Sequence, residues 1–160
     1  MRWIVAQELS RHAVMARVRD AGCYADLMVV QIGAHTIVIE GDMLITRLRG
    51  DFTAEETVAY LRLVEQVLAE HGRFFMLVDM NRADTIPPET RRISAEFGRK
   101  HPPTGMAVWG SNVAVRVLLT LILRTISFFQ KDAVPIAFVA SEHEARAWVA
   151  AQRSLRAPSK

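Results

Sequence analysis

Apolar and polar residues form a hairpin pattern from His35 onward. Residues 35–40 (HTIVIE) and 43–50 (MLITRLRG) are rich in β-branched and other apolar residues, and Gly41-Asp42 separates them. A two-residue turn of this type joins antiparallel strands. The sequence therefore predicts a β-hairpin over residues 35–50.

A helix should follow this hairpin. Thr53 and Glu56 have the spacing of a capping box, in which the threonine hydroxyl accepts a hydrogen bond from the Glu56 amide and the glutamate reaches back. Apolar residues then recur at helical spacing as far as Glu70, and Gly72 is suited to end the helix. We expect one helix over residues 53–70.

The rest of the chain continues to alternate between strands and helices. Almost wholly apolar runs predict strands that are covered on both faces, and they occupy residues 73–80, 104–110 and 134–141. Helical patterns occupy residues 88–101, residues 113–129 and a last segment that a second capping box opens at Ser141. The order β-β-α-β-α-β-α-β-α predicts an α/β sandwich, in which helices pack on a mixed, mostly parallel sheet.

Residues before His35 lack such a clear pattern. Residues 1–22 are compatible with one helix that has an irregular apolar side, and residues 23–33 have weak periodicity. This part of the chain should be poorly ordered or a loosely docked helix, and a start of translation at Met28 is an alternative interpretation. The predicted division has three parts: an N-terminal extension over 1–34, a domain over 35–152 and a basic tail over 153–160.

Composition narrows the location and the partners. The 160 residues include 20 Lys+Arg and 17 Asp+Glu, which gives a formal net charge of +3. An excess this small and this scattered does not indicate nucleic-acid binding. The single cysteine, Cys23, excludes an internal disulfide and argues against a cysteine-based zinc site. No secretion signal is visible, so we expect a cytoplasmic location.

The segment 113–129 (VAVRVLLTLILRTISFF) is the most apolar part of the chain. A membrane span is disfavoured because the run is shorter than about 20 residues and contains two arginines, Arg116 and Arg124. On a helix, the polar residues gather within about 80°, which leaves an apolar arc of roughly 240°. A surface helix needs an apolar arc of only a little more than about 100°.

This helix should therefore carry more apolar surface than one sheet can cover. The surplus needs a cover from a neighbouring helix, the N-terminal extension, a second subunit or a lipid. The candidate partner or lipid face consists of Leu118, Leu119, Ile122, Ile126, Phe128 and Phe129.

Known catalytic and cofactor motifs are missing from the sequence. It contains no GxSxG elbow, Walker loop, GxGxxG fingerprint or HExxH motif. The five histidines are scattered, and within Glu142-His143-Glu144 the capping box already explains Glu144. We therefore expect a non-catalytic protein with no metal and no cofactor.

Asp79 is the strongest single candidate for chemistry. It follows the apolar run FFMLV, so it should lie at the carboxyl end of a central parallel strand, where open α/β folds bind ligands. The favoured alternative is a local role, in which Asp79 accepts the amides of Arg82 or Ala83 as in an Asx-turn.

Arginines near the same edge suggest an anion site. Arg82, Arg91 and Arg92 could lie beside a helix start at Ser111, where free amides favour negative charge. Asp84 and Glu89 lie among the arginines, so pairing within the group is the favoured interpretation. The full candidate interaction or ligand edge is Asp79, Arg82, Asp84, Thr85, Arg91, Arg92, Ser111 and Arg116.

The predicted helix over 88–101 has few apolar residues. Its only large ones are Ile93 and Phe97, so it should lie on the sheet by one narrow stripe and present a broad charged face. Such a face is usually just solvated, and a docking role is the alternative.

Four stretches carry a resemblance to a known family. They are the hairpin ending in Gly50 with FTAEET after it, the strand–loop–helix LVDMNRADTIPPETRR, the strand–helix MAVWGSNVAVRVL and the final EARAWV. Their order resembles the STAS fold (sulfate transporter and anti-sigma-factor antagonist), and more closely its SpoIIAA-like branch of small bacterial proteins. The resemblance implies a non-enzymatic regulatory or protein-interaction module. A related topology in CRAL-TRIO lipid-transfer domains implies a bound lipophile as an alternative.

The phospho-switch of anti-sigma-factor antagonists has only a partial counterpart. The family motif places a phosphorylatable serine after an aspartate, at the start of the helix that follows the third strand. Asp84 and Thr85 are the nearest equivalents here, with no serine before Ser94, and Pro87-Pro88 stand where the family has small residues. A switch at Thr85 is left open by the resemblance.

Three functions follow from these patterns. The first is a regulatory module that works through protein contacts, with a homodimer as one form of it. The second is a protein that binds a small lipophile. The third is an enzyme that uses Asp79 at the sheet edge.

Overall fold

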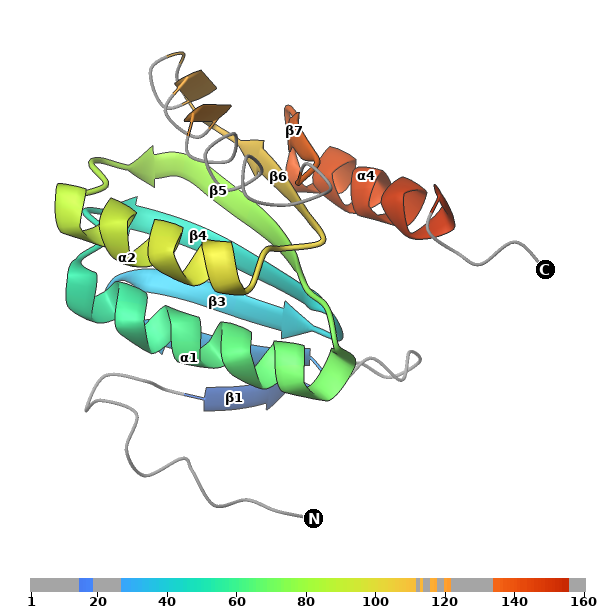
Figure 1. Ribbon diagram of the computed structural model, residues 1–160, viewed down its shortest axis with the longest axis horizontal. Helices are drawn as coiled ribbons and strands as arrows, with labels where there is room; N and C mark the ends of the chain where they lie inside the picture. Colours follow the sequence, from blue (N-terminus) through green and yellow to red (C-terminus); the bar gives the residue numbers. More distant parts are fainter. Residues whose placement is uncertain are drawn as a thin grey trace.

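The fold is one seven-stranded sheet with helices on both faces (Figure 1). The computed structural model describes residues 15–18, 27–111 and 134–155, together with positions 113, 116, 117, 120 and 121. The strands are β1 (Met15–Val18), β2 (Leu27–Ile32), β3 (His35–Glu40), β4 (Met43–Gly50), β5 (Phe75–Ala83), β6 (Gly105–Trp109) and β7 (Ile136–Phe138). The helices are α1 (Ala54–His71), α2 (Pro88–Lys100) and α4 (Glu142–Leu155).

The sheet has an antiparallel half and a parallel half. Strands β1 to β4 form antiparallel pairs in sequence order, and β4 to β7 form parallel pairs. The predicted hairpin is confirmed, with Glu40 opposite Met43 across the turn and Gly41 at a φ of 58°. The parallel strands need long crossovers, which α1 and α2 supply. The predicted α/β architecture is therefore confirmed.

The two faces of the sheet have separate cores. On one face, Leu44 of β4 packs with Leu63 and Val64 of α1. On the other face, Ile45 of the same strand packs with Val149 of α4. Adjacent residues of a strand point to opposite faces, so one apolar strand serves both cores. Figure 1 shows α1 and α2 side by side over one face.

Local caps determine where the helices begin. At α1 the Glu56 amide donates to the Thr53 hydroxyl at 3.2 Å, and the Thr53 amide donates to the Glu56 carboxylate at 2.9 Å. Gly72, in the left-handed conformation, ends α1. At α4 the Glu144 amide donates to the Ser141 hydroxyl, but the Glu144 carboxylate accepts the Ala140 amide in place of the Ser141 amide. The helix starts predicted at Thr53 and Ser141 are both confirmed.

The extension expected over residues 1–34 is corrected where the structure describes it. Residues 15–18 are strand β1 and not helix, and β2 pairs along its whole length with β3. The strand β2 has no apolar–polar alternation because both of its faces are covered: Val30 packs in one core and Val29 against the other. The ordered sheet therefore begins before His35.

Two further boundaries differ from the sequence prediction. Strand β5 continues to Ala83, into the expected loop, and α4 continues to Leu155, beyond residue 152. The positions described between 113 and 121 are helical, as expected. The predicted partner face at Leu118, Leu119, Ile122, Ile126, Phe128 and Phe129 lies outside the described residues. In the described part of the chain, no helix is long and apolar enough to cross a membrane.

Candidate functional site

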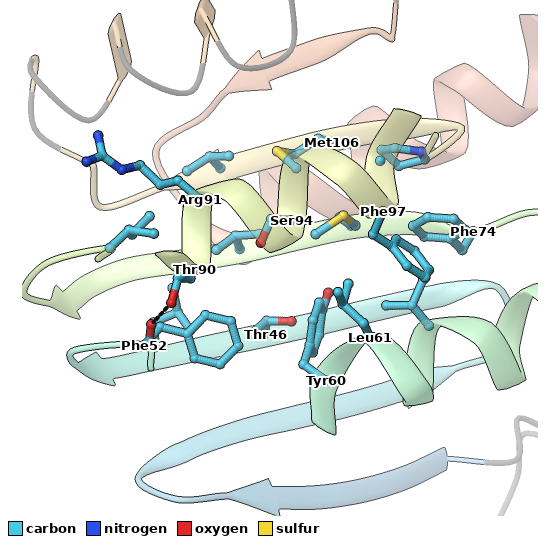
Figure 2. Close-up of a pocket in the computed structure, with 18 of the residues that line it drawn as sticks. Thr46, Phe52, Tyr60, Leu61, Phe74, Thr90, Arg91, Ser94, Phe97 and Met106 are labelled. Atoms are coloured by element: carbon cyan, nitrogen blue, oxygen red, sulfur yellow. Dashed lines mark hydrogen bonds between the residues drawn. The ribbon is translucent and has the colours of Figure 1, made fainter. Parts of the chain in front are cut away.

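A cavity of about 150 Å³ lies between the sheet and the helices α1 and α2 (Figure 2). Strands β4, β5 and β6 form its floor, α1 and α2 cover it, and Phe52, Phe74 and Ile86 close its sides. Most of the lining is aliphatic or aromatic. No sequence pattern described above predicts this cavity.

Small residues on α2 explain why the space is open. Thr90, Ser94 and Gly98 all line the cavity, and their spacing of four places them on one face of the helix. Thr90 and Gly98 are buried, so this small-residue face, together with Phe97, is the one that meets the sheet. The predicted contact through Ile93 and Phe97 alone was incomplete. The small residues at positions i, i+4 and i+8 of α2 were the sequence signal that could have revealed the second contact face.

Two neighbouring hydroxyl groups inside the cavity have no hydrogen bond of good geometry within the described residues. Thr46 of β4 and Tyr60 of α1 are each 3% exposed, and neither hydroxyl has a partner in the described part of the chain. Burial raises the pKa of Tyr60 to about 12, and the nearby Thr46 hydroxyl offsets only part of that rise. The Tyr60 hydroxyl is thus protonated at every physiological pH and can donate.

Other polar groups at the cavity are either bonded or near its edge. The Thr90 hydroxyl donates to the Phe52 carbonyl at 2.8 Å. Arg91 and His101 of the α2 region also line the cavity. Figure 2 shows the Arg91 side chain extending away from the labelled aromatic residues. The Ser94 hydroxyl also lines the cavity, so the interior is a largely apolar space in which Thr46 and Tyr60 are the polar side chains that are both buried and without a partner in the described residues.

Asp79 does not face this cavity. Val78 and Met80 line it, and Asp79 lies between them on β5, so its side chain belongs to the opposite face of the sheet. The Asp79 carboxylate accepts the Asn81 amide at 2.9 Å and the Asn81 side-chain amide at 2.7 Å. The local role expected for Asp79 is present, with Asn81 as the donor in place of Arg82 or Ala83.

The predicted arginine edge is only partly assembled. Arg92 pairs with Glu96 at 2.9 Å and with Glu89 at 4.0 Å, so pairing within the α2 surface occurs as expected. The Arg116 guanidinium donates to the Ser111 carbonyl at 3.3 Å and lies 5.5 Å from the Phe138 ring centre. Arg82 is exposed, whereas Arg91 is half-buried at the cavity. These contacts engage Arg92 and Arg116 within the protein, and an anion site at this edge stays a prediction.

Thr85 is already engaged with an aspartate. Its hydroxyl and its amide both donate to the Asp51 carboxylate, and these bonds lower the pKa of Asp51. The Asp84 amide donates to the Gly50 carbonyl at 3.0 Å. Hydrogen bonds from Asp84 and Thr85 therefore connect the segment before α2 to the end of β4.

A charged network holds α4 on the second face. Arg47 of β4 pairs with Glu142 at 2.8 Å, and Arg146 pairs with both Glu142 at 3.0 Å and Glu40 at 2.7 Å. Burial acts to raise the pKa of Glu142, but the hydrogen bonds from Arg47 and Arg146 outweigh it and lower that pKa. The described residues contain no cluster of three potential metal ligands.

Comparisons with known proteins agree with this architecture. No curated protein matches the chain. A solved structure of an uncharacterised protein of the DUF3478 family from Shewanella loihica PV-4, with a SpoIIAA-like fold, is similar with a TM-score of 0.50 and 18% identity. The similarity covers 85% of this chain and 92% of that one, and it concerns the fold. A model of the SpoIIAA-like protein family matches residues 43–150. The chain therefore belongs to the SpoIIAA-like family, a branch of the STAS superfamily.

Proposed function

We propose that the protein is a non-catalytic binding module whose ligand is a small apolar molecule held between the sheet, α1 and α2. The observation that carries this proposal is the cavity of about 150 Å³ with its largely apolar lining. Of the three functions considered from the sequence, binding of a lipophile is the one that this geometry favours.

The energetics of the cavity support an occupant. An unfilled space of this volume destabilises a protein by on the order of 3 kcal/mol, because the surrounding side chains lose contacts. An apolar molecule restores those contacts and also leaves water when it enters. A cavity with a few convergent polar groups is the usual form of a small-molecule site.

The volume limits the size of the ligand. An apolar cavity of about 150 Å³ can hold benzene. A ligand of that size fits without any movement of α2, whereas a full acyl chain would require the helix to shift. The lipophile expected from the CRAL-TRIO topology is therefore a small one in this conformation.

The arrangement of polar side chains favours binding over catalysis. Asp79 lies on the face opposite the cavity, and its carboxylate is bonded to Asn81. In the described residues, the cavity lining contains no carboxylate that could act as a base, and its one imidazole, that of His101, packs against Phe97 with 5.0 Å between the ring centres. General-base chemistry needs such a group within hydrogen-bond reach of the proton that it removes.

A cavity-filling substitution tests the proposal. Ser94→Leu places an apolar side chain from α2 in the cavity, so it should abolish the binding of toluene as measured by calorimetry. Ala95→Leu is the control, because Ala95 is the next residue on α2 and does not line the cavity. A wild-type protein that shows no heat of toluene binding, and equal thermal shifts with and without toluene, would contradict the proposal.

A regulatory role through protein contacts is the second candidate. Val113, Val117 and Leu121 are 77%, 55% and 56% exposed, and their spacing of four places them along one helical stripe. Exposed apolar stripes of this kind mark contact surfaces. Light scattering on the eluting protein tests the homodimer form: a dimer that becomes a monomer in Val117→Arg supports it, and a wild-type monomer removes it.

A further inference from the structure

Four buried polar side-chain atoms in the described residues have no hydrogen-bond partner, and the cavity contains two of them. They are the hydroxyl oxygens of Thr46 and Tyr60. The other buried threonines of α1 and α2 are satisfied, since Thr57 donates to the Thr53 carbonyl and Thr90 to the Phe52 carbonyl. A buried hydroxyl without a partner is costly and therefore rare. Two such hydroxyls in one cavity therefore need an explanation.

The two hydroxyls lie together. Thr46 comes from the floor strand β4 and Tyr60 from the covering helix α1, and Figure 2 shows both hydroxyl oxygens on the same side of the cavity. Their positions are held by packing, because the Tyr60 ring lies edge-on to Phe52, with 6.0 Å between the ring centres. The pair is thus a preformed polar spot in a largely apolar lining.

The chemistry of the pair defines its partner. Each hydroxyl has one proton to donate and lone pairs to accept with. A ketone or ether oxygen could accept from both groups, and a hydroxyl could accept from Tyr60 and donate to Thr46. The guanidinium of Arg91 extends away from the labelled aromatic residues (Figure 2), so a carboxylate or phosphate at the hydroxyl pair would leave water without gaining a cation, which strongly disfavours a charged group there.

We infer that the ligand of this cavity is a neutral, ring-sized molecule with one hydroxyl or carbonyl oxygen, and that Thr46 and Tyr60 bind that oxygen. This inference rests on the proposed function and specifies the class of ligand. The apolar lining supplies general affinity for the ring, and the hydroxyl pair selects for the oxygen and determines the orientation of the ring.

Phenol and toluene are suitable probes because they have nearly the same shape and differ by a hydroxyl in place of a methyl group. Their dissociation constants should be measured by calorimetry on the full chain, in the wild type and in Tyr60→Phe, Thr46→Val and the double variant. The quantity of interest is the ratio of the toluene constant to the phenol constant. Loss of a hydrogen bond to the ligand should change this ratio in favour of toluene, on the order of tenfold for each hydroxyl.

Thr57→Val is the matched control. Thr57 is buried on the same helix as Tyr60, but its hydroxyl donates to the Thr53 carbonyl and it does not line the cavity. Its ratio should equal that of the wild type. Each substitution preserves the shape of the side chain, and thermal melting confirms that the variants are folded before their constants are compared.

The possible outcomes separate the two claims. A ratio that is the same in the wild type and in Tyr60→Phe overturns the role of the hydroxyl pair, while toluene binding would still support an apolar cavity ligand. Failure of both probes to bind the wild type overturns the proposed function and this inference together. A ratio that shifts in both single variants and stays constant in Thr57→Val supports the inference.

Discussion

At the residue scale, the Thr85 side chain already makes a hydrogen bond in the unmodified protein. The resemblance to anti-sigma-factor antagonists left a phospho-switch at this position open. In the structure the Thr85 hydroxyl and amide both donate to the Asp51 carboxylate, and the Asp84 carboxylate lies near Gly50, the residue before Asp51. A phosphate on Thr85 would lose the hydroxyl donor and meet two negative side chains. Such a position disfavours added charge.

We therefore predict that Thr85→Glu lowers the free energy of unfolding below that of Thr85→Gln. The two variants have the same length, and only the glutamate repels Asp51 and Asp84. Urea unfolding at neutral pH measures the difference, which should shrink in high salt because exposed charges are screened. A Thr85→Glu protein as stable as Thr85→Gln at low salt would show that the loop tolerates a phosphate, and the switch would regain support.

At the element scale, the turns of the antiparallel half are determined by two glycines with similar backbones and different surroundings. Gly33 joins β2 to β3 with a φ of 56°, and Gly41 joins β3 to β4 with a φ of 58°. A β-carbon at Gly33 would overlap the Glu56 carboxylate, whereas one at Gly41 has no atom within 4 Å. Glu56 is the capping residue of α1, so the turn at Gly33 also abuts the start of that helix.

We predict that Gly41→Ala costs about 1 kcal/mol of stability, because a left-handed backbone disfavours any side chain with a β-carbon. Gly33→Ala should cost more than Gly41→Ala, since it adds displacement of Glu56 from the Thr53 cap. Urea unfolding of the two variants compares the costs directly. Equal losses would mean that Glu56 moves aside freely and that the contact between this turn and α1 contributes little.

The orientation of helix α2 also depends on the elements against which it packs. Its sequence places Ile93 and Phe97 on one stripe, and Thr90, Ser94 and Gly98 on an adjacent one. Hydrophobicity alone favours the first stripe as the contact with the sheet. Burial of Thr90 and Gly98 shows that the small residues also face inward, so α2 comes close to the sheet at these positions while leaving room between them.

At the scale of the whole molecule, the two faces of the sheet are packed differently. The face under α1 and α2 contains the cavity. The face under α4 has a buried apolar core, with Trp148 of α4 packed against it and an ion network at its edge. A β-carbon at Gly105 of β6 would lie 2.8 Å from the Trp148 ring, so α4 approaches β6 closely. We regard the α4 side as the rigid support of the binding side.

The network predicts a pH dependence for that support. The pKa of Glu142 is lowered from 4.5 in the folded protein, so its pairing stabilises the fold above pH 4.5 and is lost as the pH falls through the lower folded value. In Glu142→Gln this contribution is absent. The stability difference between wild type and variant should therefore be small but constant at neutral pH, where exposed pairs contribute at most about 1 kcal/mol, and should vanish in acid.

Urea unfolding between neutral pH and pH 3 measures this difference. Glu144→Gln is the control on the same helix, because an amide oxygen can still accept the Ala140 amide that the Glu144 carboxylate accepts. Its stability should run parallel to that of the wild type across this range. A Glu142→Gln profile that also stays parallel would show that the arginine pairs do not stabilise α4.

The cytoplasmic location and the absence of a cofactor remain predictions from the sequence, as does a protein partner. The binding experiments above do not depend on them. The family is shown by the match over residues 43–150, and the specific ligand or partner is the part that the experiments address.

The sequence by itself determined the features that depend on neighbouring residues. The turn at Gly41, the capping box at Thr53 and the left-handed end at Gly72 each need only a few consecutive positions, so local patterns identify them. The apolar runs of β5 and β6 likewise identify buried parallel strands, because covered strands need apolar residues on both faces. These signals together predicted the α/β architecture, and the family followed from the resemblance of the four stretches.

Only the tertiary structure decided which side chains meet. Asp79 was assigned to the correct strand, but the alternation of side chains along it places this carboxylate on the face opposite the cavity. Strand β2 was missed because its apolar residues serve two cores at once. The cavity is formed by strands and helices far apart in sequence, and the hydroxyls of Thr46 and Tyr60 become neighbours only when α1 packs on β4. Space between elements is a property of packing, and no local pattern of residues contains it.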